Sequence, residues 1–385
     1  MWIIRKLGVS MTLAMLALSG LSGAEAGPTS GGVVTGPVEY LETIALEGGG
    51  AASARIVGDY LYVANYHHIS IYEISDPLDP KLQSMTPIGF NPFSMEDIDT
   101  NGKILVFPQE SRRILHVWDV SDKTKPVPLA QLPEAGDHML TCVLDCTWVY
   151  GSSPRHSIVD LRDPANPKLV GQWNEGLDAT VTHDVTEVAP GRVVTASEPS
   201  VYFLDARKDP ARPRPLAVAP VAQELPLDRP REILSSTRWP RGTKDRFLLI
   251  AGETPASGPC NERSAAFTTW DARRWKRTHS FTLIDQFRMK NGTFADGNPP
   301  ANAIGCSSSF FEEHPSFKGG GLVTVAWFEH GTRFLKVEPN GKLSEVGAFL
   351  PYGGLTLSSF WVDDKIVYAI DQNRGIDILR YTGKL

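Results

Sequence analysis

Residues 138–173 read HMLTCVLDCTWVYGSSPRHSIVDLRDPANPKLVGQW. The stretch contains four short runs rich in β-branched, aromatic and other apolar residues: MLTCV, TWVYG, SIVDL and LVGQW. The last two runs are separated by a polar turn, RDPANPK, in which aspartate can cap its own backbone and proline fixes φ. Runs of this length, bounded by turn residues, predict strands. The stretch therefore predicts one four-stranded sheet, which cannot bury both of its faces alone.

The same design recurs before and after this stretch. The turn prolines Pro80, Pro126, Pro167 and Pro213 follow one another at intervals of 46, 41 and 46 residues. A period in the forties with four strands per unit is typical of a β-propeller. Three looser units follow from about Glu232 onward. We therefore predict an all-β chain that forms a seven-bladed β-propeller of four-stranded blades.

The seventh unit, LSSFWVDDKIVYAIDQNRGIDILRY, has only three strand-like runs. A lone strand, VEYLETIAL at 38–46, precedes the first unit. We expect this N-terminal strand to complete the last blade, because that pairing closes the ring and removes an exposed sheet edge. Residues 38–385 are then a single propeller domain. The glycine-rich residues 27–37 are expected to be a flexible leader.

The turns EISDPLDP, DVSDKTKP and DLRDPANP resemble those of the LVIVD-repeat family of exported bacterial β-propellers. The later segments AWFEHGTRFLKV and GIDILRY resemble that family's closing blades. The resemblance covers roughly residues 38–383. It implies an exported propeller and no particular chemistry.

The N-terminus has the layout of a secretory signal peptide. Arg5 and Lys6 precede an apolar run from Leu7 to Leu18, and small residues follow up to Ala26. The apolar run is too short for a membrane span, and no second long apolar segment occurs. We expect residues 1–26 to be cleaved near Ala26 and the protein to be secreted or periplasmic, with no membrane span.

Charge and cysteines restrict the environment further. The net charge of −6 argues against a nucleic-acid partner, which would require a basic face. An exported chain can form disulfides. The four cysteines allow three disulfide connectivities. We favour Cys142–Cys146, which are close in sequence, together with Cys260–Cys306, which lie in more distant segments. Half of a zinc site at Cys142 and Cys146 is the rival interpretation, disfavoured because no second cysteine pair accompanies it.

Histidines mark the predicted channel mouth. His138 and His183 occupy the same place in successive units, just before an innermost strand, and His330 lies on a turn between strands. The candidate ligand-binding or metal-binding residues are His67, His68, His138, His183, Asp184, Glu329 and His330. Imidazoles that converge from several blades would suit Zn, Cu or Fe. The alternative is that they are polar residues lining a water-filled channel.

Residues 97–102, DIDTNG, match the opening of a calcium loop. The twelfth position of such a loop needs a bidentate glutamate, but Pro108 stands there. The other units have a plain hairpin turn at this place. We therefore predict a turn rather than a calcium site.

Two functions are compatible with the sequence. The first is a binding or scaffold propeller that presents its channel-mouth loops to an unknown protein or glycan. The alternative is a metal-dependent enzyme with a site built from His138, His183 and His330. No complete catalytic motif is present, so no catalytic residue is assigned.

Overall fold

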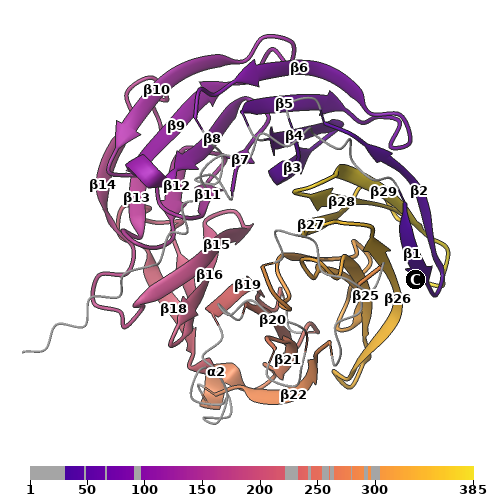
Figure 1. Ribbon diagram of the computed structural model, residues 1–385. Coiled ribbons are helices and arrows are strands. Elements are labelled where there is room, and N and C mark those ends of the chain that lie inside the picture. Colours follow the sequence, from indigo (N-terminus) through magenta and orange to yellow (C-terminus); the bar gives the residue numbers. More distant parts are fainter. Residues whose placement is uncertain are drawn as a thin grey trace, which may run out of the picture.

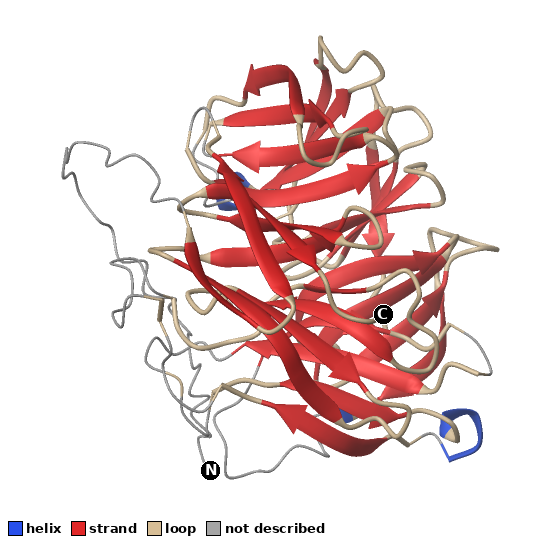
Figure 2. Ribbon diagram, turned by 90° about the vertical axis from the view of Figure 1, so that its right-hand side faces the viewer, coloured by secondary structure: helices blue, strands red, loops and turns tan. Residues whose placement is uncertain are grey.

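Seven small sheets stand like blades around a central axis in the computed structural model (Figure 1). The structure describes residues 31–46, 49–65, 67–90, 97–221, 233–241, 244–253, 260, 264–278, 280–289, 294–295 and 304–385. The expected signal peptide at 1–26 lies outside these residues. Strands make up nearly all of the regular structure (Figure 2). Short helical segments occur at η2 (Glu110–Arg112) and α2 (Trp275–Thr278). The all-β, seven-bladed prediction is confirmed.

The blades follow the chain in order, and each sheet begins with its innermost strand. Blade one contains β3 (Ala51–Val57), β4 (Tyr60–Asn65), β5 (His68–Glu73) and β6 (Lys81–Pro87). Blade two contains β7 (Asp99–Thr100), β8 (Ile104–Gln109), β9 (Ile114–Asp119) and β10 (Val127–Pro133). Blade three contains β11 (Leu140–Val143), β12 (Trp148–Gly151), β13 (Ser157–Asp160) and β14 (Lys168–Gln172). Blade four contains β15 (Val181–Ala189), β16 (Arg192–Glu198), β17 (Val201–Asp205) and β18 (Arg214–Ala219).

The looser second half of the chain keeps the same order of strands. Blade five contains β19 (Ile233–Arg238), β20 (Phe247–Glu253), β21 (Phe267–Asp271) and β22 (Thr282–Phe287). Blade six contains β23 (Phe311–Glu313), β24 (Gly321–Ala326), β25 (Thr332–Val337) and β26 (Leu343–Pro351). Blade seven contains β27 (Thr356–Trp361), β28 (Ile366–Asp371) and β29 (Gly375–Tyr381).

The N-terminal segment closes the ring, as Figure 1 shows beside the yellow C-terminal strands. Strand β2 (Val38–Ile44) pairs antiparallel with β29 and becomes the fourth strand of blade seven. This closure confirms the sequence prediction. The flexible leader expected at 27–37 is corrected in part, because Gly32–Thr35 form β1 and pair with β26 of blade six. This short run, GVVT, lies between glycines, which obscure its strand character in the sequence.

The proline turns repeat for a local reason. The aspartate that opens each turn accepts a hydrogen bond from the backbone N–H two residues later. Leu78 donates to Asp76 in blade one, and Ala165 donates to Asp163 in blade three. A tyrosine of the preceding blade donates its hydroxyl to a carbonyl of some of these turns. Tyr368 contacts the Pro77 carbonyl at 2.7 Å. The turns therefore join neighbouring blades as well as neighbouring strands.

The core lies between blades rather than within one. Each pair of neighbouring blades shares a cluster of buried apolar side chains, such as Val143, Tyr150 and Val185 between blades three and four. Central strands such as β12 and β28 are buried along their whole length, whereas outer strands such as β14 alternate between exposed and half-buried. A single blade would leave both faces exposed, so the ring stabilises each blade through its neighbours.

Both predicted disulfides are present. Cys142 is bonded to Cys146 across the hairpin after β11, and Cys260 is bonded to Cys306. A search of the described residues for a helix long and apolar enough to cross a membrane found none.

Candidate functional site

A pocket of about 490 Å³ lies on the axis of the ring, and all seven innermost strands contribute to its lining. We call it the axial pocket. Its lining includes Arg55, Asp97, Asp99, Asp184, Glu187, Arg238, Phe310, Glu312, Glu313, Ser358 and Phe360, with Asp145 and Arg241 exposed at its rim. Its volume is within the usual range of small-ligand sites. Carboxylates outnumber cationic groups in this lining.

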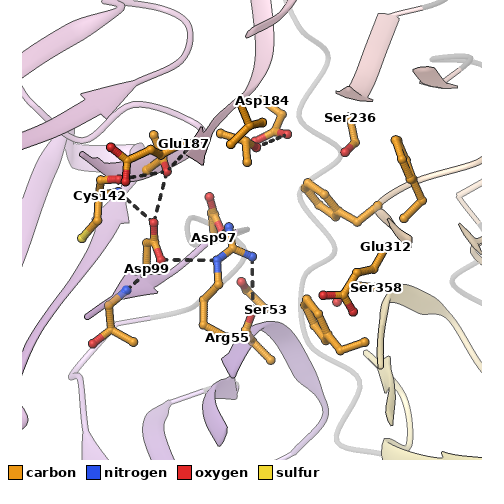
Figure 3. Close-up of a pocket in the computed structure, with 18 of the residues that line it drawn as sticks. Ser53, Arg55, Asp97, Asp99, Cys142, Asp184, Glu187, Ser236, Glu312 and Ser358 are labelled. Atoms are coloured by element: carbon orange, nitrogen blue, oxygen red, sulfur yellow. Dashed lines mark hydrogen bonds and ion pairs between the residues drawn. The ribbon is translucent and has the colours of Figure 1, made fainter. Parts of the chain in front are cut away.

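Arg55 of β3 is the central cation of the axial pocket (Figure 3). Its guanidinium lies 3.0 Å from Asp97 and 3.5 Å from Asp99. Burial lowers the pKa of Arg55, but the surrounding carboxylates outweigh this effect and hold the pKa above its usual value. The other two arginines of the pocket, Arg238 and Arg241, both pair with Glu313. Arg55 is thus the arginine whose positive charge Asp97, Asp99, Asp184 and Glu312 share.

Some of these acids also join neighbouring blades. Asp99 accepts a hydrogen bond from the backbone N–H of Cys142 at 2.8 Å, and Glu312 accepts one from Trp361 at 2.7 Å. Such bonds cross gaps where no strand pairing exists. Part of the pocket's acidic lining therefore has a structural role, because buried backbone N–H groups need acceptors.

Burial shifts the pKa values of several acids of the axial pocket. Burial raises the pKa of Asp97 to about 7 despite the attraction of Arg55, and it raises the pKa of Glu312 to about 7. Burial also raises the pKa of Asp184 to about 6. Asp184 is 3% exposed, and its Oδ1 has no hydrogen-bond partner among the described residues. A buried carboxylate oxygen without a donor is unfavourable, and a cation beside it would stabilise the ionised carboxylate.

A second cluster surrounds the two histidines that the sequence singled out. The Nε2 atoms of His138 and His183 lie 3.3 Å apart, and the rings meet edge to face. The Nδ1 of His138 contacts Glu110 Oε2 at 3.0 Å, and the Nδ1 of His183 contacts the Ser235 carbonyl oxygen at 3.2 Å. Glu253 Oε2 lies 3.5 Å from His183 Nε2. We call His138, His183, Glu110 and Glu253 the histidine cluster.

Local backbone irregularities position this cluster. His183 is the extra residue of a β-bulge between β15 and β16, and Ser235 is the extra residue of a bulge between β19 and β20. A bulge redirects a side chain relative to the regular alternation of a strand. His138 precedes β11, where its backbone N–H donates to the Ser153 carbonyl oxygen at 2.8 Å. With Glu110 of blade two, four successive blades therefore contribute to this cluster.

The pKa values of the two carboxylates in the histidine cluster are shifted in opposite directions. The hydrogen bond from His138 holds the pKa of Glu110 below its usual value. Burial raises the pKa of Glu253 to about 7, although Ser235 Oγ donates to its Oε1 at 3.0 Å. Glu253 thus lies in a poorly solvated position beside two imidazoles, where it would be stabilised by positive charge.

His330 and Glu329 belong to a different cluster, which corrects the three-histidine site expected from the sequence. His330 Nε2 contacts Cys260 Sγ at 3.0 Å, and its ring stacks on Phe294. Cys260, Cys306 and His330 form a compact group of metal-ligand types, but the two sulfurs are bonded to each other. Disulfide sulfurs are not thiolate ligands. Glu329 accepts the backbone N–H of Gly305 at 2.8 Å.

Of the remaining histidine candidates, His67 lies on the turn between β4 and β5, and His68 is the first residue of β5. His67 is exposed, and its carbonyl oxygen accepts the Ile88 N–H. His68 is half-buried and pairs with Asn65 and Pro87 through its backbone. Asp184, next to His183 in sequence, lines the axial pocket. Phe310 connects the two sites, since it lines the pocket and its ring centre is 6.4 Å from that of His183.

Sequence reasoning missed Arg55, Glu110, Glu253 and Glu312. In the sequence, Asp97 and Asp99 stand out only through their resemblance to a calcium loop. The predicted hairpin turn is present, because the Asn101 side chain accepts the N–H groups of Lys103 and Ile104. The available signal for the pocket is the pair of aspartates two residues apart at the start of blade two, where Asp97 precedes β7 and Asp99 begins it.

The profile of the LVIVD repeat matches residues 48–85. No curated protein matches the chain. Among solved structures, "YCF48 bound to D1 peptide" is similar with a TM-score of 0.55 and 9% identity over 92% of this chain and 100% of that chain. The "N-terminal Domain of Nup159" is similar with a TM-score of 0.55 and 12% identity over 92% of this chain and 96% of that chain. At these identities the likeness shows the fold alone. The chain is therefore a seven-bladed β-propeller that carries an LVIVD repeat.

Proposed function

We propose that this chain is an extracytoplasmic binding protein whose axial pocket receives a cationic group of a protein partner. The N-terminal signal-like segment and the two disulfides support the location, because disulfides persist in oxidising compartments. The observation that carries the binding proposal is the excess of buried carboxylate around Arg55, together with the unpartnered Oδ1 of Asp184.

A lysine or arginine side chain suits this pocket better than a neutral glycan. A positive group near Asp184 and Glu312 would favour their ionised forms, whose pKa values burial raises to about 6 and about 7. Phe310 and Phe360 add aromatic surface to the lining, which is favourable for cations. Peptide binding by a propeller has a precedent in the structure titled "YCF48 bound to D1 peptide".

The experiment measures fluorescence anisotropy of labelled hexalysine and hexaglutamate peptides with the full chain, in low salt with a metal chelator. We expect hexalysine to bind and hexaglutamate not to bind. Glu312→Gln and Asp184→Asn should each weaken hexalysine binding by about tenfold, because each removes one charge-assisted contact. Glu175→Gln is the matched control, since Glu175 is exposed, lies outside the pocket lining and carries the same charge.

Two results would overturn the proposal. One is the absence of hexalysine binding. The other is an equal loss of affinity in Glu175→Gln, which would indicate that only the net charge of the protein matters.

A further inference from the structure

A second pocket adjoins the axial pocket between blades five and six, and its volume is also about 490 Å³. We call it the side pocket. Four residues line both pockets, which places the pockets side by side: Arg238, Arg241, Glu312 and Glu313. The lining that belongs to the side pocket alone includes Lys244, Asp245, Phe317 and Lys318.

Both pockets lie at the same end of the ring. Lys244 comes from the loop between β19 and β20, and Lys318 comes from the loop between β23 and β24. The rim residue Asp145 of the axial pocket comes from the corresponding loop of blade three, between β11 and β12. Each of these loops joins the innermost strand of a blade to its second strand. A ligand that enters from this end therefore meets both pockets.

The two pockets have opposite charge. In the side pocket four cationic side chains face three carboxyl groups, whereas carboxyl groups are in the majority in the axial pocket. The arginines of the side pocket are balanced by protein carboxylates. Arg238 pairs with Asp245 and Glu313, and Arg241 lies 3.0 Å from Glu313. Arg238 is also fixed in place by Phe317, whose ring centre lies 4.5 Å from the guanidinium carbon.

The uncompensated charge of the side pocket therefore belongs to its two lysines. Lys244 and Lys318 are exposed, and their ammonium groups have no ion-pair or hydrogen-bond partner among the described residues. Four cations against three carboxyl groups leave room for one negative charge. A carboxylate carries one such charge, whereas a phosphate monoester carries nearly two. The side pocket thus matches a carboxylate better than a phosphate.

We propose that the side pocket receives a carboxylate of the same partner whose cationic group enters the axial pocket. This inference rests on the proposed function, and it adds that the partner presents a basic and an acidic side chain close together. A compact cavity of this volume is roughly 10 Å across, which two or three extended residues span at about 3.3–3.6 Å each. We therefore expect the acidic residue two or three positions from the basic one. A purely acidic peptide lacks the cation, so the axial carboxylates repel it.

The experiment compares two unlabelled, end-blocked peptides, GGKGEG and GGKGQG, which differ by one carboxylate. Each competes with labelled hexalysine for the full chain, followed by fluorescence anisotropy in low salt with a metal chelator. We expect GGKGEG to bind about threefold to tenfold more tightly than GGKGQG, the effect of one carboxylate near two exposed ammonium groups. In the double variant Lys244→Gln/Lys318→Gln the two peptides should compete equally.

The double variant Lys168→Gln/Lys208→Gln is the matched control. It removes two exposed lysines that lie outside both pockets, so it should keep the preference for GGKGEG. Binding of hexalysine by both double variants shows that they are folded.

The outcomes separate this inference from the proposed function. If hexalysine binds and the wild type does not distinguish the two peptides, the inference is overturned and the proposed function stands. A preference that persists in Lys244→Gln/Lys318→Gln, or that is lost equally in the control, also overturns the inference. A phosphoserine in place of the glutamate that improves binding by more than about tenfold would assign the side pocket to phosphate instead. Absence of hexalysine binding would overturn the proposed function, and this inference with it.

Discussion

Arg374 forms a bidentate ion pair with Asp377 on the last strand of the chain, and both side chains are fully buried. The guanidinium Nε lies 2.9 Å from Asp377 Oδ2, and Nη2 lies 2.7 Å from Oδ1. Thr43 of β2 bonds to both partners, to Arg374 at 2.9 Å and to Asp377 at 2.5 Å. The ion pair thus lies at the seam where the N-terminal strand closes the ring.

The first prediction concerns this seam. Asp377→Ala should destabilise the protein by about 3–5 kcal/mol, because it leaves the Arg374 charge buried without its main partner. Urea unfolding of the variant and the wild type measures this difference. Glu39→Ala removes a half-exposed partner of Arg380 on the same strand pair, and it should cost less than about 1 kcal/mol. A similar small loss in both variants would contradict the account.

The second prediction separates two buried tyrosines. Tyr368→Phe should destabilise the protein by about 1 kcal/mol or more, since it removes the bond to the Pro77 carbonyl of the next blade. The Tyr202 hydroxyl has no hydrogen-bond partner among the described residues, so Tyr202→Phe should be neutral or stabilising. Thermal unfolding of the two variants compares them directly. Destabilisation of both to the same extent would show that the bond between blades is unimportant.

The third prediction concerns pH. Burial raises the pKa of Glu312 to about 7 in the folded chain, whereas an unfolded glutamate has a pKa of about 4.3. The folded state therefore holds a proton that the unfolded state has released, and stability falls as pH rises between these values. Glu312→Gln should raise stability by about 1–3 kcal/mol at pH 8 and leave it unchanged near pH 4.

Denaturant unfolding of Glu312→Gln across this pH range provides the measurement. Glutamine can still accept the Trp361 N–H, so the bond to blade seven is retained. A variant less stable than the wild type at pH 8 would show that the ionised carboxylate stabilises the folded chain, contrary to the account.

The fourth prediction ranks the disulfides. Cys260 and Cys306 are 46 residues apart, whereas Cys142 and Cys146 are 4 apart. Loop entropy predicts that Cys→Ser replacement costs about 4 kcal/mol for the long pair and about 2 kcal/mol for the short pair. Urea unfolding of the two double variants measures the order. A larger loss of stability for the Cys142–Cys146 pair would contradict this ranking. It would indicate that the short bridge stabilises the chain by holding the pocket lining beside Asp99 rather than through loop entropy.

The fold could be predicted because its signals are local and repeated. Each proline turn is fixed by an aspartate within two residues, and the missing fourth strand of the last blade identifies the N-terminal strand as its partner. Strand β1 escaped notice because four residues between glycines carry almost no periodic signal.

The sites were only partly predictable. His138 and His183 repeat one position in neighbouring blades, so the sequence places them together, as the structure does. His330 lies instead on the turn between β24 and β25 of blade six, and it contacts Cys260. The position of a residue within its blade indicates its height along the propeller axis. It does not indicate which residues of other blades lie beside it around the ring. Glu110 and Glu253 come from other strand ends without a repeat, so only the folded chain identifies them.

The central claim is that the axial pocket binds a cationic group. A crystal structure of the chain with a lysine-containing peptide tests it most directly. The account predicts a lysine ammonium within hydrogen-bond distance of Asp184 Oδ1 and near Glu312, inside the ring of innermost strands. A peptide bound on the outer strands, with Asp184 Oδ1 still without a donor, would contradict the claim.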